Sequence, residues 1–211
     1  VGSEMCIRDR YNYIHIGNAR PMIVFDTLRR YLEYLGNKVL YVSNITDIDD
    51  KLIKKGQENG TTMQEVARKF EAEYIKDSEG LNVKAPTVRP RATEHIGEII
   101  KIVKDLVESG HAYVAHNGDV YFRVKSDPGY GKLSHLNLDD LESGNRELRS
   151  QMDDDLKEDP ADFAVWKAAK PGEPSWNSPW GQGRPGWHIE CSAMARKHLG
   201  KTIDLHAGGQ D

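Results

Sequence analysis

Apolar side chains recur at the spacing of an α-helix in three stretches of the chain, and residues 187–199 are also typical of a helix. The periodic sets are Val24, Phe25, Leu28, Tyr31, Leu32 and Leu35, then Val66, Phe70 and Tyr74, and then Ile96, Ile99, Ile100, Val103, Leu106 and Val107. Gly36 and Asn37 end the first helix in the usual C-terminal manner, and Thr93 is the expected N-cap of the third.

Two short strands are predicted in the same parts of the chain. Residues 39–42 form a continuous apolar run, which suits a strand buried in a parallel sheet. A second strand is predicted at residues 203–205. Because helices and buried strands alternate, we predict an α/β fold with a Rossmann-like, doubly wound parallel sheet connected by crossovers.

After the third periodic helix the pattern changes to short strands. Residues 112–115 and 120–124 are strand-like, and the Asn-Gly dipeptide at 117–118 favours a hairpin turn because both residues tolerate positive φ. The acidic stretch 139–159 is predicted to be a solvated face. The stretch 171–187, rich in Pro, Gly and Trp, is predicted to be an ordered irregular loop.

These patterns predict a domain in two halves, residues 11–111 and 179–211, interrupted by a connective insertion at 112–178. Residues 1–10 are charged where the fold needs an apolar strand, so we expect them to be an artefactual or scarred N-terminus. The sequence stops at residues 208–211, GGQD, in the middle of a motif, so we expect a fragment of a longer protein.

Charge and cysteine usage exclude several classes of protein. The formal net charge of −4 argues against a simple basic nucleic-acid module, although a local patch could still contact RNA. No apolar run reaches the length of about 18 residues that a membrane span needs, so no membrane contact is expected. Cys6 and Cys191 lie far apart and form no disulfide framework, so we expect a cytoplasmic protein.

Residues 15–21, HIGNARP, precede and begin the first long helix. A helix N-terminus presents unpaired N–H groups and a positive dipole end, which favour a phosphate. Gly17 would let a nucleobase approach the backbone, and His15 could donate to a phosphate oxygen in the transition state. A His-x-Gly sequence before a helix is also common in ordinary turns, so the motif alone does not decide between the two.

Near its end the chain places chemistry-bearing residues next to a helix and a strand. Cys191 lies near the start of the helix at 187–199, and His206 follows the predicted strand with Gly208 and Gly209. In an open α/β sheet, ligands bind at the carboxyl ends of strands. Read in isolation, Cys191 suits a small buried apolar residue, and His206 suits a satisfied loop histidine.

Four blocks in order resemble class I aminoacyl-tRNA synthetases, in their cysteine-specific form. Residues 11–21, YNYIHIGNARP, resemble the nucleotide-binding signature, and residues 44–51, NITDIDDK, are similar to the second block. Residues 129–134, GYGKLS, resemble the family's insertion, and residues 171–194 resemble the third block. The resemblance covers about residues 11–211 and implies ATP-dependent activation of L-cysteine to cysteinyl-adenylate, followed by transfer to tRNA(Cys).

The resemblance also implies roles for individual residues. The ATP site, with its Mg²⁺, would use His15, Gly17, Asn18, Gly208, Gly209 and Asp211, with His15 and Asn18 catalytic. Many relatives have His at the position of Asn18, which can still donate a neutral hydrogen bond. The substrate cysteine would contact Thr46, Trp187 and His206.

The family binds Zn²⁺ through two Cys, one His and one Glu, and the substrate thiolate occupies an open position. Cys191 matches the second cysteine ligand, and Cys6 matches the first by position only, because Ile7-Arg8-Asp9-Arg10 replaces the expected Gly-Pro-Thr-Val. The His and Glu ligands, the phosphate-clamping lysine loop and the anticodon-binding helices would lie beyond Asp211. We therefore expect the chain alone to be inactive.

Zinc would account for substrate choice, because a shape pocket separates cysteine poorly from serine whereas a borderline-soft metal prefers sulfur. Two alternatives stay open. One is the related ligase that joins cysteine to glucosaminyl-inositol in mycothiol synthesis. The other is a non-catalytic nucleotide- or zinc-binding remnant.

Overall fold

The computed structural model describes residues 1–7, 12–132, 135 and 156–207, and the chain divides into two compact units. The first unit comprises Val1–Glu98 with Glu190–Asp211, and the second comprises Ile99–Ile189. In chain order the elements are β1 (Gly2–Ile7), α1 (Ile16–Tyr34), β2 (Leu40–Ile45), α2 (Asp50–Glu58), α3 (Met63–Gly80), η1 (Ala92–Glu94), α4 (Ile96–Glu108), β3 (Ala112–Val114), β4 (Val120–Phe122), η2 (Val124–Ser126), β5 (Phe163–Ala168), β6 (Trp176–Ser178), β7 (Gly181–Pro185), α7 (Trp187–Leu199) and β8 (Leu205–Ala207). The domain boundaries expected from the sequence stay a prediction.

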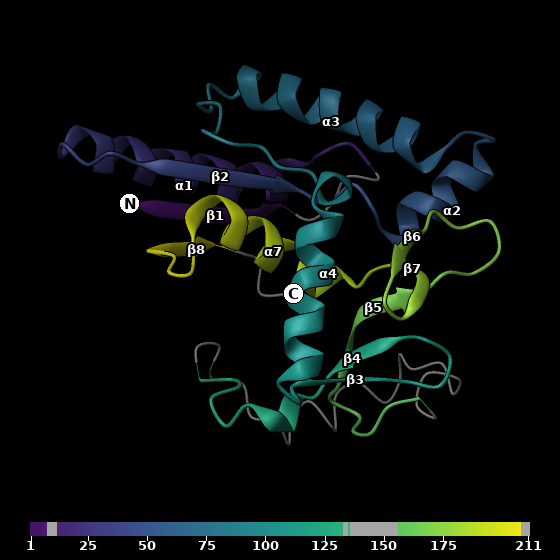
Figure 1. The fold of residues 1–211 in the computed structure, drawn as a ribbon. Coiled ribbons are helices and arrows are strands. Elements are labelled where there is room, and N and C mark those ends of the chain that lie inside the picture. The colour runs from purple at the N-terminus through teal and green to yellow at the C-terminus, as the bar shows by residue number, and fades with distance from the viewer. Residues whose placement is uncertain (8–11, 133–134, 136–155, 208–211) are drawn as a thin grey trace. The chain divides into compact units, whose positions relative to one another are not determined.

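The first unit is built on a parallel sheet with the strand order β2-β1-β8 (Figure 1). Strand β1 pairs with β2 from Gly2↔Leu40 to Ile7↔Ile45, and it pairs with β8 around Glu4↔His206. Residues 2–7, expected to be a scarred terminus, therefore form the strand between β2 and β8. The strand predicted at residues 203–205 lies two residues later, as β8.

Helices cover both faces of this sheet, because successive side chains of a strand point to opposite faces. Tyr41 of β2 packs in one buried cluster with Met22 of α1 and Tyr74 of α3. Asn44, three residues further along β2 and thus on the other face, contacts Cys191 of α7. The predicted doubly wound α/β fold is confirmed. Within the described residues, no helix has both the length and the apolar character needed to cross a membrane.

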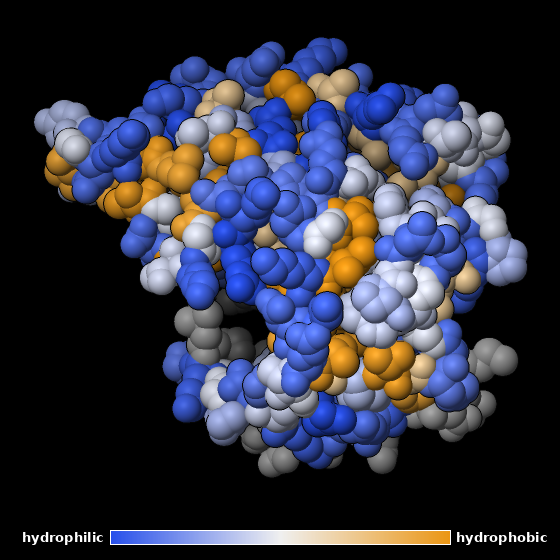
Figure 2. Space-filling model, viewed as in Figure 1, coloured by the Kyte–Doolittle hydropathy of each residue, from blue (hydrophilic) through white to orange (hydrophobic). Residues whose placement is uncertain are grey.

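The first helix is also confirmed, but much of its apolar stripe lies on the exposed side. Side chains of that stripe that remain exposed are Val24, Leu28, Tyr31 and Leu35. Figure 2 shows hydrophobic surface gathered where Figure 1 places α1. The buried side of the helix carries Ala19 and Met22 together with the charged residues Asp26 and Arg29. The last two also have partners outside the helix, on the backbone of the segment after α3: Asp26 accepts from the amide of Lys84 at 3.0 Å, and Arg29 donates to the carbonyl of Ala85 at 2.7 Å.

The second unit contains an antiparallel sheet with the order β3-β4-β5-β7-β6. Its β3–β4 hairpin confirms the turn predicted at Asn117-Gly118, where Gly118 has a φ of +91°. The irregular loop predicted for residues 171–187 is wrong, because β6 and β7 pair there as a hairpin. Glycine is required in β7, since a Cβ at Gly183 would collide with the indole of Trp166.

Two further expectations concerned the N-cap of the third periodic helix and the acidic stretch 139–159. Thr93 is not the N-cap of the third periodic helix: α4 begins at Ile96, and Thr93 lies in η1, where its hydroxyl donates to Asp47. The acidic stretch lies mainly outside the described residues.

Candidate active site

His15 is the N-cap of α1 and uses its own ring to hold the first turn. Its Nδ1 accepts from the amide of Gly17 at 3.0 Å, and its amide donates to Oδ1 of Asn18 at 3.0 Å, which completes a capping box. A Cβ at Gly17 would lie 2.7 Å from Cε1 of His15, so only glycine permits this contact. Because Nδ1 accepts a hydrogen bond, the proton of a neutral ring lies on Nε2. The exposed His15 therefore presents an N–H donor beside the N-terminus of α1.

Thr46 follows directly after β2 and is 3% exposed. Its Oγ1 has no hydrogen-bond partner among the residues that the structure describes. A buried hydroxyl without a partner carries a desolvation cost, and such groups cluster where a ligand completes the bonding. At this edge of the sheet, Thr46 is therefore a candidate contact for a bound molecule.

The backbone after Thr46 is held in place by two acidic side chains. Asp47 accepts from the amide of Thr93 at 2.9 Å and from the hydroxyl of the same residue. Burial raises the pKa of Asp47 above its ordinary value, and the Thr93 hydrogen bonds oppose that shift. Asp49 caps α2 by accepting from the amide of Lys51 at 2.7 Å.

Cys191 is half-buried on α7, and the amide Nδ2 of Asn44 lies 2.9 Å from its sulfur. The β1–β2 register places the backbone of Cys6 directly opposite Asn44. Both cysteines expected as metal ligands therefore belong to segments that meet at Asn44. Sequence reasoning gave Asn44 no role of its own, although an amide residue just after the apolar run 39–42 was a signal that could have found it, and the structure shows that Asn44 is fully buried.

These two thiols fit one half of a four-ligand zinc set in donor chemistry. Among the described residues, no group of three or more His, Cys, Asp or Glu side chains could hold a metal ion. The metal itself stays a proposal.

Of the other expected residues, His206 lies in β8 and is exposed. Trp187 is the first residue of α7, belongs to the second unit and stacks on His188 with ring centres 5.9 Å apart. Gly208, Gly209 and Asp211 lie outside the described residues. His15, Thr46 and His206 belong to the first unit, whose parallel strands have their carboxyl ends at one edge.

Comparisons with known proteins cover the whole chain. Residues 1–211 match the family described as tRNA synthetases class I (C) catalytic domain. Cysteine--tRNA ligases of Caldicellulosiruptor saccharolyticus and Limosilactobacillus reuteri are 58% and 57% identical over 211 residues, which is 100% of this chain and 44% and 45% of theirs. The chain therefore spans less than half the length of these relatives.

Among solved structures, the Mycobacterium tuberculosis methionyl-tRNA synthetase in complex with methionyl-adenylate matches with a TM-score of 0.70 and 13% identity, covering 100% of this chain and 51% of that one. At this identity the likeness shows the fold alone.

Proposed function

The chain belongs to the class I (C) tRNA synthetase catalytic-domain family, and from that premise we propose that it is part of a cysteine--tRNA ligase. The observation that carries the proposal is the 57–58% identity to cysteine--tRNA ligases along the whole chain. The reaction has two steps. The carboxylate of L-cysteine attacks the α-phosphate of ATP and releases pyrophosphate, and a terminal ribose hydroxyl of tRNA(Cys) then attacks the cysteinyl carbonyl and releases AMP. Since aminoacylation serves protein synthesis, a cytoplasmic location is part of the same proposal.

His15 and the start of α1 would bind ATP, supplied with Mg²⁺. The Nε2–H of His15 would donate to a phosphate oxygen as negative charge builds in the transition state, and the helix dipole would favour the same charge. The Oδ1 of Asn18 is used by the cap, which leaves its amide N–H groups as the donors for a nucleotide. From the resemblance, Gly208, Gly209 and Asp211 would contact the nucleotide as well.

Thr46 would contact the substrate cysteine, with Trp187 and His206. The support for Thr46 is its buried hydroxyl, which lacks a partner among the described residues and would gain one from a bound amino acid. Such a contact positions the carboxylate for attack rather than taking part in bond formation.

Zinc selection of cysteine belongs to the same proposal. Cys191 and Cys6 would supply two thiolate ligands, and the amide of Asn44 would orient the Cys191 sulfur through a hydrogen bond. When bound, zinc supplies a preference for a substrate thiolate over a hydroxyl.

The decisive experiment uses the complete protein that contains this chain. We expect cysteine-dependent ATP–pyrophosphate exchange, and we expect His15→Ala to lower it by about 10²–10³-fold with zinc content unchanged. A complete, folded protein that shows no exchange with cysteine would overturn the proposed activity.

Cys191→Ser tests the metal assignment separately. A hydroxyl stays protonated at neutral pH and is a poor zinc ligand, so zinc content and cysteine binding should both fall, while ATP binding changes little. Ser192→Ala, at the exposed neighbouring position on α7, is the matched control and should keep full zinc content. Full zinc occupancy in the Cys191→Ser protein would show that Cys191 is not a ligand.

A further inference from the structure

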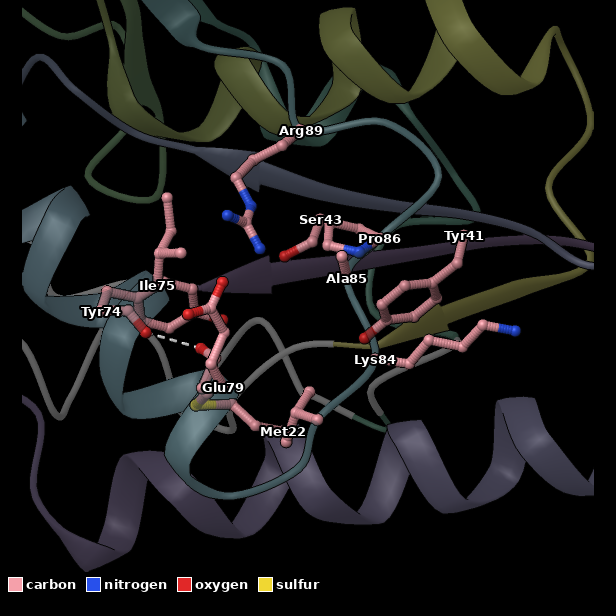
Figure 3. A pocket seen from close by; sticks show the side chains of 12 residues that line it. Met22, Tyr41, Ser43, Tyr74, Ile75, Glu79, Lys84, Ala85, Pro86 and Arg89 are labelled. Atoms are coloured by element: carbon pink, nitrogen blue, oxygen red, sulfur yellow. Dashed lines mark hydrogen bonds between the residues drawn. The ribbon is translucent and has the colours of Figure 1, made fainter.

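A cavity of about 130 Å³ lies in the first unit, between β2, α1, α3 and the segment after α3 (Figure 3). Its apolar wall includes Met22, Ile75 and Val83. None of His15, Thr46, Cys191 or His206 lines it, so the cavity is separate from the candidate active site.

Three polar side chains face this cavity without a hydrogen bond or ion pair to any described residue. The side chain of Ser43 is buried, with the residue 3% exposed, and its amide rather than its hydroxyl is bonded. Arg89 has a buried Nε with no partner, and its guanidinium lies 5.9 Å from the ring of Tyr74. Glu79 lies at the exposed side and makes no ion pair. Figure 3 shows the Arg89 guanidinium and the Glu79 carboxylate pointing toward each other across the space, with the Ser43 hydroxyl beside them.

Lys84, the other cationic residue of the cavity lining, already has an ionic partner. Lys84 Nζ lies 2.7 Å from Glu33, so its charge is balanced outside the cavity. Among the described residues of the lining, the Arg89 guanidinium, the Glu79 carboxylate and the Ser43 hydroxyl are therefore the groups available to a ligand. Because Arg89 and Glu79 do not meet in an ion pair, a molecule between them that carries both charges would satisfy both.

We propose that this cavity binds a small zwitterionic α-amino acid. Its carboxylate would accept from Arg89 and Ser43, its ammonium would donate to Glu79, and its side chain would contact Met22 and Ile75. An apolar cavity of about 150 Å³ admits benzene, so this one has room for about six non-hydrogen atoms, which is the size of alanine. A simple anion would gain no contact with Glu79, and a simple amine would gain none with Arg89.

The test is ligand-detected NMR titration of the purified chain with L-alanine, propionate and ethylamine. Propionate lacks the ammonium and ethylamine lacks the carboxylate, so each tests one charge. We expect saturable binding of alanine with half-saturation below about 10 mM, and binding of either analogue weaker by about tenfold or more. No saturable alanine binding would overturn the proposal. Propionate binding as tightly as alanine would overturn the zwitterion and indicate an anion site.

Variants then locate the binding. Glu79→Gln and Arg89→Met should each weaken alanine binding by about tenfold, because each removes a charge-assisted hydrogen bond. Glu79 is exposed, so its variant tests the proposal even if Arg89→Met unfolds. Glu73→Gln, on the same helix but outside the lining, is the matched control and should bind as the parent does. An equal loss in Glu73→Gln would overturn the assigned location.

Thr46→Val separates this proposal from the proposed function. It should leave alanine binding by the cavity unchanged, because Thr46 does not line the cavity. A loss in Thr46→Val without a loss in Glu79→Gln would place the amino acid in the candidate active site and refute the cavity proposal.

Discussion

The buried hydroxyl of Thr46 gives the sharpest test of the candidate site. Thr46 is 3% exposed, and its Oγ1 has no partner among the described residues. An unsatisfied buried polar group costs about 1–3 kcal/mol. Thr46→Val keeps the β-branched shape and removes that cost, so the variant should be more stable than the parent by about 1 kcal/mol. For a chain of this size, the midpoint of thermal unfolding should rise by about 2–4 °C.

Thr93→Val is the matched control, because the hydroxyl of Thr93 does have a partner. It donates to the carboxylate of Asp47, which is buried and also accepts from the Thr93 amide. Removing the hydroxyl leaves part of a buried carboxylate unsatisfied, which costs about 1–3 kcal/mol. The same chemical change should therefore stabilise the protein at one position and destabilise it at the other.

Thermal and urea unfolding of the purified chain measure both variants, and cysteine-dependent exchange by the complete protein measures function. If Thr46 contacts the substrate, Thr46→Val should raise the KM for cysteine by about tenfold, since one hydrogen bond is lost. A Thr46→Val protein as destabilised as Thr93→Val would refute the claim that the hydroxyl lacks a partner. A stabilised variant with an unchanged KM for cysteine would refute the substrate contact.

Two further predictions concern how the first unit is held together. Burial, and then the neighbouring His95 at 3.0 Å between Nε2 atoms, lower the pKa of His198. The unfolded chain then binds this proton at higher pH than the folded chain, so stability should fall as the pH drops below about 6.5, and His198→Gln should reduce that loss in urea unfolding measured at several pH values. The guanidinium of Arg91 bonds both Glu71, whose side chain is 8% exposed, and Glu94, whose side chain is 56% exposed. Glu71→Gln should cost about 1–2 kcal/mol and Glu94→Gln at most about 0.5 kcal/mol, and equal losses would contradict this difference in burial.

The spacing of apolar side chains predicts local secondary structure well in this chain, but α1 shows what that spacing cannot predict. The spacing of apolar residues predicts the helix, but it does not predict which side is buried. Asp26 and Arg29 can be buried because the backbone of Lys84 and Ala85 forms hydrogen bonds with them, and these two residues lie on a segment far along the sequence. Each side chain also pairs within α1, Asp26 with Arg30 and Arg29 with Glu33, but the backbone partners on the distant segment cannot be found from helical periodicity. The apolar stripe alone therefore does not identify the buried face.

The second unit shows a different limit. Strand β7 was not predicted because glycine and proline normally weaken a strand. Here Gly183 is required by the close approach of Trp166 on the neighbouring strand β5, which was itself not predicted. In the sequence, a glycine that is needed because a neighbouring side chain leaves no room for a Cβ cannot be told apart from a glycine that is needed for a turn.

For the candidate site, the family motifs identify residue types but give no contacts. His15 was expected to act on phosphate, and the structure adds that its Nδ1 is occupied by the cap, so only Nε2 is available to donate. Cys191 was expected as a ligand, and the structure adds the amide of Asn44 at its sulfur. Both findings come from hydrogen bonds, and the spacing of residues in a motif does not show which hydrogen bonds form.

The order of the strands explains why the candidate site is discontinuous in sequence. Strand β1 lies between β2, which follows it closely, and β8, which comes from the far end of the chain. The register with β2 sets Cys6 opposite Asn44, and the face of β2 that carries Asn44 receives α7 with Cys191. A shift of this register by one residue would turn Asn44 to the face of α1 and α3, away from Cys191. The intervening sequence does not set this arrangement. The pairing of β1 with β2 places the backbone of Cys6 opposite Asn44, and the packing of α7 against the sheet brings Cys191 to the same amide.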